Sequence, residues 1–554
     1  MPKIHKIMKI KHLLLIILPV FVLVSAGKIA ADRFEIVKNL DIFTDVYNKV
    51  STLYVDDVQP GDLMKKGIDE MLKSLDPYTV YYPESEVEDY KFMTTGQYGG
   101  IGARIRKDGE DIVISEPYED SPARTAGLIA GDIIMEVDGI SVKGKSVNDM
   151  SSFLKGTPGT KLKVKVKRPF VDKLIELEIT RKEIKVSSVP YHAEIDKGIG
   201  YIKLTSFTQN IGEEVKDALV DLKNNHKIEK LIFDLRDNGG GLLNEAVNIV
   251  NLFISKNIKV VETKGRVDSW NSSYKTLNPP IDKEMPVVIL VNSSSASASE
   301  IVSGSLQDLD RAVIIGKETY GKGLVQTTKP LKYNGSIKVT TAKYYIPSGR
   351  CIQALDYGDK DEFGKAKKIP DSLFSTFTTL NGRKVQDGHG IQPDLEVEQD
   401  KYSLLVRQLV NESHLFNFVT DFYYQNSTID SPEKYRVTDK EYNAFKAYLE
   451  DKKFVYESLS DKRLKDLEKM LEEENFTAAT SSSIENLKNT ITSEKEKAFD
   501  KDKEMIKFLL QSEIVTRYYF QKGRIINALN RDPYIFKAKE ILNNINEYNK
   551  ILGK

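Results

Sequence analysis

Cysteine and histidine are scarce in this chain of 554 residues. The single cysteine, Cys351, excludes an internal disulfide bond and any metal site built from a cysteine cluster. The six histidines are scattered without an HExxH pair, so a metallopeptidase is disfavoured and no cofactor is expected. An excess of either charge is also missing, because 81 acidic residues balance 81 lysines and arginines. Nucleic acid is therefore not expected as the main partner.

The apolar run of residues 13–24 follows a lysine-rich segment without acids and precedes Ser25, Ala26 and Gly27. This order of basic, apolar and small residues is typical of a secretion signal. The run is shorter than the ~20 residues that a membrane-spanning helix needs. We expect residues 1–31 either to be cleaved after Ala26 or to remain as an N-terminal membrane anchor. The protein would then be exported, to the periplasm or to the outer face of the inner membrane.

The chain is too long for one hydrophobic core, and its residue patterns change along its length. Helical spacing of apolar residues comes first, followed by short strands with glycines, then by alternating strands and helices, and finally by long amphipathic helices. The expected fold is multidomain α/β, with a flexible joint at residues 477–483. The predicted segments are 1–31 (signal or anchor), 32–88 (helical), 89–172 (strand-rich), 173–400 (α/β core) and 401–554 (helical).

Buried strands and amphipathic helices alternate within the predicted core, residues 173–400. Such a rhythm is typical of a sheet that is covered by helices. The expected strands are residues 198–204, 230–235, 286–291 and 311–316. The expected helices are residues 213–223, 242–253 and 298–309.

Three glycines flank one aliphatic residue in the sequence YGGIG, residues 98–102, just before a predicted strand. Glycines let successive backbone N–H groups converge on one point, where a carboxylate can bind. A peptide could then add as a further strand beside residues 103–105. A turn without any binding role is the alternative, and from this loop alone it is the commoner one.

Five serines crowd residues 292–301, directly after the predicted strand 286–291. A serine hydroxyl is a weak nucleophile and needs a base to activate it. Ser297 and Glu300 also match the S-x-x-E capping box, which marks the start of a helix. Spacing alone therefore favours a helix cap at Ser297 over a catalytic role.

Two kinds of base are available to such a serine. His192 and His389 are the histidines that could reach it in space. Lys322, which lies between two glycines, could serve instead, but only as a neutral amine. Lowering a lysine pKa from about 10.4 to about 7.5 requires roughly 4 kcal/mol from the environment. Gln326 lies on the same face of a predicted strand and could orient the amine without adding charge.

Residues from about 90 to 170 resemble a PDZ domain, both in the glycine loop and in SPARTAGLIAGDIIMEVDGISV, residues 121–142. The resemblance implies that the loop binds the C-terminus of a protein chain. The peptide-binding residues that follow from it are Gly100, Ile101 and Gly102, with Met150, Phe153 and Leu154 as candidates for the apolar pocket. Core packing is an equal alternative for each of the last three.

Residues 176–400 resemble the core of the C-terminal processing peptidases, family S41, which are serine peptidases with a Ser–Lys dyad and an embedded PDZ domain. Ordered motifs over about 360 residues carry the resemblance. They are LDPYTVYY (75–82), DLRDNGGGLL (234–243), VNSSSASASEIVSG (291–304), GKETYGKGLVQ (316–326), TAKYYIPSGRCIQ (341–353) and GHGIQPD (388–394).

The resemblance implies catalytic roles for three residues, with Ser297 as nucleophile, Lys322 as base and Gln326 as its helper. It also implies an oxyanion hole made of the backbone N–H groups of Gly240 and Ala298. The family often has proline where this chain has Gly239, so the assignment of Gly240 holds to within one residue.

Together these features predict an exported serine endopeptidase that binds substrate C-termini through its PDZ domain and cleaves through an acyl-enzyme. The alternative from another class is a PDZ scaffold that binds peptides without turnover. The expected partners are proteins with accessible C-termini. Residues 401–554 are expected to form a homodimer or higher homo-oligomer, or to dock an adaptor protein.

Overall fold

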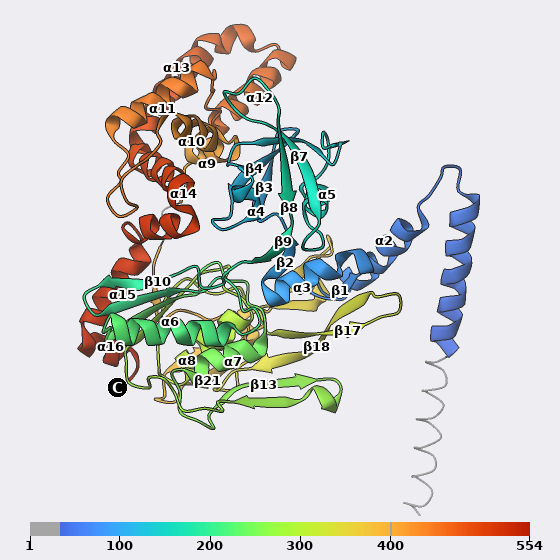
Figure 1. Ribbon diagram of the computed structural model, residues 1–554, viewed down its shortest axis with the longest axis vertical. Helices are drawn as coiled ribbons and strands as arrows, with labels where there is room; N and C mark the ends of the chain where they lie inside the picture. The colour runs from blue at the N-terminus through green and yellow to red at the C-terminus, as the bar shows by residue number, and fades with distance from the viewer. Residues whose placement is uncertain (1–33, 399–400) are drawn as a thin grey trace, which may run out of the picture. The chain divides into compact units, whose positions relative to one another are not determined.

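The structure is a computed structural model that describes residues 34–398 and 401–554 (Figure 1). The secretion signal expected in residues 1–31 lies outside the described residues. The chain divides into two units, Met1–Tyr81 with Thr328–Val339, and Tyr82–Thr327 with Thr340–Lys554. Among the described residues, no helix combines the length and the hydropathy that crossing a bilayer requires.

In its described part, from residue 34 on, the first unit contains two helices and the tip of a β-hairpin. Residues 34–53 are helical, and α2 (Pro60–Lys73) follows after a short turn. Pro60 is the first residue of α2, where its missing N–H costs no intrahelical hydrogen bond. Both helices lie in the segment that the sequence predicts to be helical.

The mainly parallel sheet of the second unit has six strands in the order β10-β11-β12-β15-β16-β23. The strands from β11 to β23 are parallel, and β10 pairs antiparallel at the edge. Their bounds are β10 (Tyr191–Asp196), β11 (Ile199–Lys203), β12 (Lys230–Asp234), β15 (Val287–Val291), β16 (Val313–Gly316) and β23 (Leu395–Glu396). The four predicted strands are confirmed, because a parallel sheet covered on both faces needs continuous apolar runs.

Helices cover both faces of this sheet (Figure 1). On one face, α6 (Ile211–Asn225), α7 (Leu243–Asn251) and α8 (Ala298–Asp308) share an apolar core with the strands, which confirms the three predicted helices. On the other face, α15 (Pro533–Asn543) and α16 (Ile545–Ile551) pack against the alternate side chains of the same strands. The last helices of the chain therefore belong to the α/β core, which the sequence did not indicate.

An antiparallel sheet forms the strand-rich region, in the order β3-β4-β5-β7-β8 with β6 beside β5. Its strands are β3 (Ala103–Asp108), β4 (Asp111–Pro117), β5 (Ile133–Val137), β6 (Ile140–Ser141), β7 (Lys161–Lys167) and β8 (Ile175–Thr180). Two helices, α4 (Pro122–Thr125) and α5 (Val147–Leu154), accompany it. Ser146 and Asp149 form a capping box that starts α5.

Shorter elements connect these parts. α3 (Val87–Thr95) leads into β2 (Gln97–Gly100), which pairs with β9 (Lys182–Lys185). A further sheet contains β17 (Leu324–Pro330), β18 (Ser336–Tyr345), β13 (Lys259–Gly265) and β14 (Ser272–Lys275). The remaining strands are β1 (Val80–Tyr82), β19 (Leu355–Lys360), β20 (Ala366–Lys368), β21 (Thr376–Thr378) and β22 (Lys384–Gln386).

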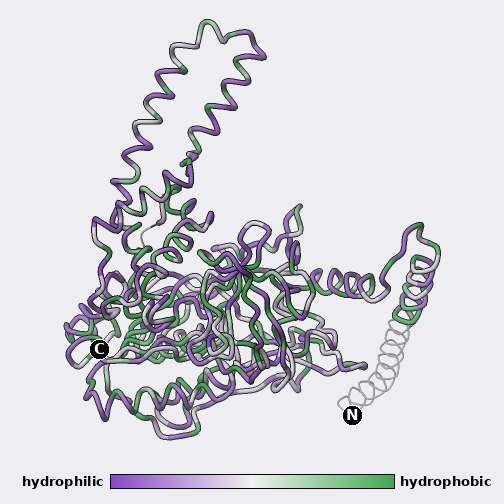
Figure 2. Tube along the Cα trace, turned by 45° about the horizontal axis from the view of Figure 1, so that its top comes forward, coloured by the Kyte–Doolittle hydropathy of each residue, from purple (hydrophilic) through white to green (hydrophobic). Residues whose placement is uncertain are grey.

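Six helices follow residue 400 before the chain returns to the sheet. They are α9 (Leu404–Asn411), α10 (His414–Gln425), α11 (Asp439–Asp451), α12 (Leu459–Glu473), α13 (Thr477–Lys501) and α14 (Lys503–Leu529). An apolar core joins α9, α10, α11 and α14. In contrast, α12 and α13 form a largely hydrophilic hairpin (Figure 2) that ion pairs hold together, such as Lys488 with Glu468 at 2.6 Å.

The flexible joint predicted at residues 477–483 is wrong, because these residues form the first turns of α13. Serine and threonine cost only about 0.5 kcal/mol each relative to alanine in a helix. The helix they begin continues to Lys501 and pairs with α12, as in the ion pair between Lys495 and Asp461 at 2.8 Å. The chain turns instead at residues 474–476.

Candidate active site

Three loops meet beside the carboxyl ends of the parallel strands β12 and β15, and we call them the serine corner (residues 234–241, 292–300 and 319–323). Open α/β sheets usually carry their sites at this edge. Asn292 joins the first two loops, because its amide donates to Asp237 Oδ1 at 2.8 Å and accepts from the Asp237 N–H at 3.0 Å. The serine-rich segment therefore lies where a sheet of this kind holds its reactive groups.

Geometry separates the five serines of residues 292–301. The first two are exposed in a turn. Ser295 and Ser299 are fully buried, and their hydroxyls donate to backbone carbonyls of the loop after β12 at 2.8 Å. Such hydroxyls are structural groups. Ser297 is half-buried, which distinguishes it from the other four.

The backbone of Ser297 is strained, with φ 56° and ψ −112°. Non-glycine residues rarely adopt a positive φ, and strain of about 1–3 kcal/mol persists mainly at functional sites. The conformation turns the chain sharply from β15 into α8. The hydroxyl faces the N–H of Glu300 in the manner of a capping box, without forming a hydrogen bond of standard geometry. The reciprocal hydrogen bond of the capping box expected from the spacing is present, because the Glu300 carboxylate accepts the Ser297 N–H at 2.7 Å.

Glu300 is fully buried and connects Ser297 to the loop that holds Lys322. Its carboxylate accepts four hydrogen bonds, from the N–H groups of Ser297 (2.7 Å), Gly321 (2.7 Å) and Lys322 (2.9 Å) and from the Thr319 hydroxyl (2.5 Å). Burial raises the pKa of Glu300, and these hydrogen bonds oppose the rise. Sequence reasoning missed this role, because the S-x-x-E spacing reports only the local cap.

Gln326 lies near the start of β17, whereas Lys322 lies in the loop two residues before the strand, not on the strand itself as the sequence predicted. The Lys322 backbone is fixed by Glu300, and the Gln326 amide donates to Thr340 Oγ1 on β18 at 3.2 Å. A Cβ at Gly323 would lie 2.8 Å from the backbone nitrogen of Gln353, so the loop packs closely against another segment. The structure thus brings the backbones of Ser297 and Lys322 to one carboxylate. The catalytic roles of the three side chains stay predictions.

Gly240 lies directly beside Ser297. A Cβ at Gly240, which has φ 99°, would come within 2.8 Å of Ser297 Cβ and 2.9 Å of the Ala298 nitrogen, whereas a Cβ at Gly239 would meet nothing within 4 Å. The Gly240 N–H donates to Asn238 Oδ1 at 2.9 Å. Stabilising an oxyanion would require the asparagine to release this donor. Ala298 is the first residue of α8, where N–H groups lack partners within the helix.

The two histidines considered as bases occupy different places. His192 lies on the edge strand β10, three strands or about 14 Å from β15, and its Nε2 is 3.3 Å from Asp221. His389 lies next to Gly390, whose Cβ position is 2.4 Å from the carbonyl oxygen of Thr319 in the serine corner. Its Nδ1 is buried and makes no hydrogen bond within the part of the chain that the structure describes. His389 is therefore the histidine that competes with Lys322.

A second buried carboxylate, Asp234, anchors the loop of Gly240. It accepts hydrogen bonds from the Arg236 side chain at 3.0 and 2.7 Å and from the Tyr201 hydroxyl at 2.8 Å, and the Lys203 ammonium lies 3.2 Å away. Burial alone would raise the pKa of Asp234, but Arg236 and Lys203 outweigh burial and lower the pKa well below its usual range. Arg236 also pairs with Asp532, the cap of α15, at 2.6 Å.

The predicted peptide-binding loop connects β2 to β3. Gly102 has φ 73°, and a Cβ there would lie 2.5 Å from the Cβ of Ser121, so only glycine fits. Ile101 is 2% exposed and packs into the core of the antiparallel sheet. Gly100 is the last residue of β2 and pairs with Lys182. The loop is thus fixed by strands and core on both sides.

The three candidates for the apolar peptide pocket differ in burial. Met150 is fully buried and Leu154 is 5% exposed, both within the core of the antiparallel sheet. Phe153 packs at the margin of that core, with the Lys145 ammonium 5.3 Å from its ring centre. Phe153 is therefore the candidate with a face open to a ligand, and the binding roles of all three stay predictions.

Family models match three parts of the chain. Residues 198–358 match "Peptidase family S41", residues 113–168 match "PDZ domain", and residues 405–542 match "Probable PDZ-protease, C-terminal helical domain". The α/β fold class with an embedded PDZ domain and flanking helices, predicted from the sequence, is confirmed.

Similar proteins carry the same description. The chain is 37% identical over 321 residues to a carboxy-terminal-processing protease of Bartonella bacilliformis, covering 57% of this chain and 73% of that protein. It is 37% identical over 311 residues to a "Probable CtpA-like serine protease" of Staphylococcus haemolyticus, covering 55% and 61%. A solved photosystem II D1 C-terminal processing protease shares 26% identity with a TM-score of 0.36, covering 64% and 92%. The chain therefore belongs to the carboxy-terminal-processing proteases, serine proteases of peptidase family S41 with a PDZ domain.

Proposed function

We propose that the protein is an exported endopeptidase in which Ser297 and Lys322 form a catalytic dyad. One observation carries the proposal. One oxygen of the buried Glu300 carboxylate, Oε2, accepts the backbone N–H groups of both residues, which holds their backbones close together. The strained backbone of Ser297 and the structural roles of the buried serines beside it support the same choice of nucleophile.

The dyad works through an acyl-enzyme. Neutral Lys322 takes the hydroxyl proton of Ser297 while Oγ attacks the carbonyl carbon of the scissile peptide bond. Gln326 orients the amine, and the N–H groups of Gly240 and Ala298 stabilise the oxyanion. The protonated lysine then gives its proton to the leaving amine as the C–N bond breaks.

Deacylation reverses these roles. Lys322 takes a proton from a water molecule, whose oxygen attacks the ester carbonyl. The C–O bond to Ser297 breaks, the new carboxylic acid leaves, and the lysine returns the proton to Oγ. Each half of the reaction thus restores the proton balance of the dyad.

The PDZ domain selects the substrate in this proposal. The loop of residues 100–102 binds the terminal carboxylate, the peptide extends beside β3, and an apolar side chain packs against Phe153. The substrates are proteins with accessible, apolar C-termini. A non-catalytic PDZ scaffold is the alternative function.

Export and assembly complete the proposal. The signal pattern of residues 1–31 supports action in the periplasm or at the outer face of the inner membrane, with the segment cleaved or kept as an anchor. Exposed apolar side chains on the helix of residues 34–53, including Phe34, Leu40 and Phe43, support a homo-oligomer. The hydrophilic α12–α13 hairpin is the surface that we assign to an adaptor protein.

The test is cleavage of an unstructured protein substrate with an apolar C-terminus by the full chain. Ser297→Ala and Lys322→Ala should each lower kcat/KM by at least about 10⁴-fold without changing the unfolding temperature. Ser294→Ala, an exposed serine in the preceding turn, is the matched control and should keep full activity.

Two outcomes would contradict the proposal. Activity of Lys322→Ala within tenfold of the wild type, together with its loss in His389→Ala, would move the base to the histidine. Binding of the C-terminal peptide without any cleavage, and without reaction with a serine-directed probe, would favour the scaffold.

A further inference from the structure

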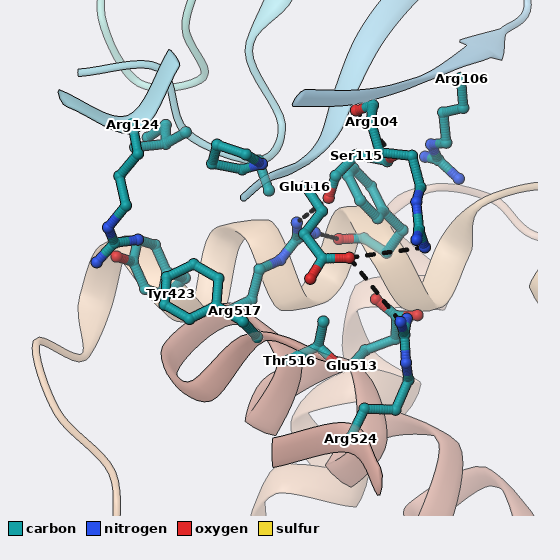
Figure 3. Close-up of a pocket in the computed structure, with 15 residues that line it drawn as sticks. Arg104, Arg106, Ser115, Glu116, Arg124, Tyr423, Glu513, Thr516, Arg517 and Arg524 are labelled. Atoms are coloured by element: carbon teal, nitrogen blue, oxygen red, sulfur yellow. Dashed lines mark hydrogen bonds and ion pairs between the residues drawn. The ribbon is translucent and has the colours of Figure 1, made fainter. Parts of the chain in front are cut away.

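A basic cavity of about 220 Å³ lies between the PDZ domain and the C-terminal helices, within the second unit (Figure 3). Five arginines line this arginine cavity, namely Arg104, Arg106 and Arg124 from the PDZ domain and Arg517 and Arg524 from α14. Two carboxylates, Glu116 and Glu513, also line it. Five positive charges against two leave a positive excess. The cavity shares no lining residue with the serine corner, so cleavage does not explain that excess.

Arg517 is the buried centre of the cavity, with 9% of its surface exposed. Figure 3 shows its side chain reaching from α14 toward the strands of the PDZ domain. Among the described residues, it donates only to neutral groups, which are the carbonyls of Ser115 (3.3 Å) and Phe416 (3.2 Å) and the hydroxyl of Thr420 (3.0 Å). Its Nε is buried and has no hydrogen-bond partner among the described residues. A buried charge left in this state is costly unless an opposite charge joins it.

A second guanidinium repeats the pattern. Arg106 stacks on the Phe416 ring at 3.8 Å from its centre, and Arg517 stacks on the same ring at 4.0 Å. The Nε of Arg106 is also buried without a hydrogen-bond partner within the described chain, although Asp108 lies 3.4 Å from another nitrogen. Two like charges that share one ring repel each other. An anion bound in the cavity would offset that repulsion.

The carboxylates present do not supply this anion. Glu116 lies 3.7 Å from Arg104 and 3.9 Å from Arg524, beyond hydrogen-bond distance for both. Burial lowers the pKa of Arg517 to about 10. The negative charge of Glu513 opposes this effect from longer range. The guanidinium groups therefore keep donors that neither acid occupies.

We propose that the arginine cavity binds a small oxyanion with at least two negative charges, of the phosphate-monoester or polycarboxylate class. Guanidinium groups present forked donors that match both phosphate and carboxylate oxygens. The cavity is smaller than the ~300–1,000 Å³ of drug-sized ligand sites, so the ligand is small. Tyr423, Phe520 and Ile129 line the remaining wall and accommodate its carbon skeleton.

The bound anion would touch both walls of the cavity. Arg104 and Arg106 belong to β3, the strand that we expect to receive the substrate peptide, and Arg517 belongs to α14. A ligand that bridges them stabilises the folded chain increasingly as its concentration rises above its Kd. The unfolding temperature therefore reports binding independently of proteolysis.

The experiment is calorimetric titration of the full chain at low ionic strength, with inorganic phosphate in one arm and citrate in the other. We expect saturable binding of at least one anion and a rise in unfolding temperature with its concentration. Arg517→Met should weaken the affinity about 100-fold, and Arg524→Gln about tenfold, because each removes charge-assisted hydrogen bonds. Binding in only one arm identifies the ligand as phosphate or carboxylate, and either result supports the site.

Two control variants keep the test specific. Lys107→Gln removes an exposed charge next to Arg106 on β3, and Arg463→Gln removes one on α12 whose side chain is 87% exposed. Both should bind as the wild type does. A site of several arginines should bind such an anion well below about 10 mM. If the wild type binds neither anion at this concentration, the proposal is overturned. An anion affinity that is unchanged in Arg524→Gln would also overturn the proposal. Because Arg524 is the more exposed of the two arginines, this variant tests the proposal even if Arg517→Met does not fold.

Discussion

The serine corner and the arginine cavity both contain buried charge, but they treat it in opposite ways. In the corner, Glu300 accepts four hydrogen bonds, and Asp234 is matched by Arg236 and Lys203. In the cavity, Arg517 donates only to neutral oxygens and leaves its Nε without a partner among the described residues. A satisfied buried charge fixes a geometry, whereas an unsatisfied one points to a missing ligand.

The largest effect is expected at Asp234. Asp234→Asn removes the buried counter-charge of Lys203 and one of the two carboxylates that pair with Arg236, so the free energy of unfolding should fall by about 3–5 kcal/mol at pH 7. Urea unfolding measures this directly. Asp217→Asn, at an exposed acid on α6, is the matched control and should change little. A loss below about 1 kcal/mol at Asp234 would show that the corner does not depend on its ion pairs.

The same carboxyl sets a pH dependence. Because the pKa of Asp234 is lowered in the folded chain, its contribution to stability is present above the ordinary aspartate pKa of about 3.9. That contribution is lost as the pH falls from this value through the lowered pKa of the folded state. The wild type should therefore lose more stability than Asp234→Asn between pH 5 and pH 3.

The two glycines of the oxyanion loop provide the next prediction. Gly240→Ala places a Cβ against Ser297 at a positive φ, and kcat should fall by about 10²–10³-fold. A Cβ at Gly239 meets nothing within 4 Å, so Gly239→Ala is an unstrained surface change of small effect. Its kcat should stay within about threefold of the wild type. Steady-state cleavage rates compare the pair. Equal losses in both variants would remove Gly240 from the site.

Glu300→Gln should have a smaller effect than these. The amide keeps one acceptor oxygen, so about two of the four hydrogen bonds are lost, at roughly 1 kcal/mol each. We expect the unfolding free energy to fall by about 2 kcal/mol and kcat to fall about 100-fold, with peptide binding to the PDZ domain unchanged. Glu213→Gln, at an exposed position of α6, serves as control. Unchanged kcat would mean that Glu300 does not position Lys322 and Ser297.

The smallest effect is expected in the cavity. Replacing an unpaired buried charge by an apolar side chain is often neutral, so Arg517→Met should stay within about 1 kcal/mol of the wild type in buffer without phosphate or citrate. Urea unfolding at pH 7 measures the difference. A loss as large as that of Asp234→Asn would show that the arginine already has its partner within the protein, and the contrast between the two regions would disappear.

Local patterns explain what the sequence could predict. The four buried strands and the helices after them follow from continuous apolar runs and from helical spacing, both of which report burial directly. The place of α15 and α16 on the far face of the sheet could not be predicted, because amphipathic spacing indicates that a face is buried but not what buries it. The prediction of a flexible joint at residues 477–483 is wrong for a related reason. Composition alone does not show that a neighbouring helix packs against the segment.

The sites show the same limit. Glu300 could be identified as a cap from its distance of three residues to Ser297, but its bonds to Gly321 and Lys322 connect separate loops. The arginine cavity brings Arg106 and Arg517 together from opposite ends of the chain, and no spacing rule relates them. The catalytic assignments came from ordered family motifs, which report positions that physics alone left open.

Labelling with a fluorophosphonate probe, followed by mapping of the modified peptide, tests the central claim most directly. If Lys322 activates Ser297, the label appears on Ser297, is lost in Lys322→Ala, and persists in His389→Ala. A label on another serine, or one that survives in Lys322→Ala and disappears in His389→Ala, would contradict the Ser297–Lys322 dyad.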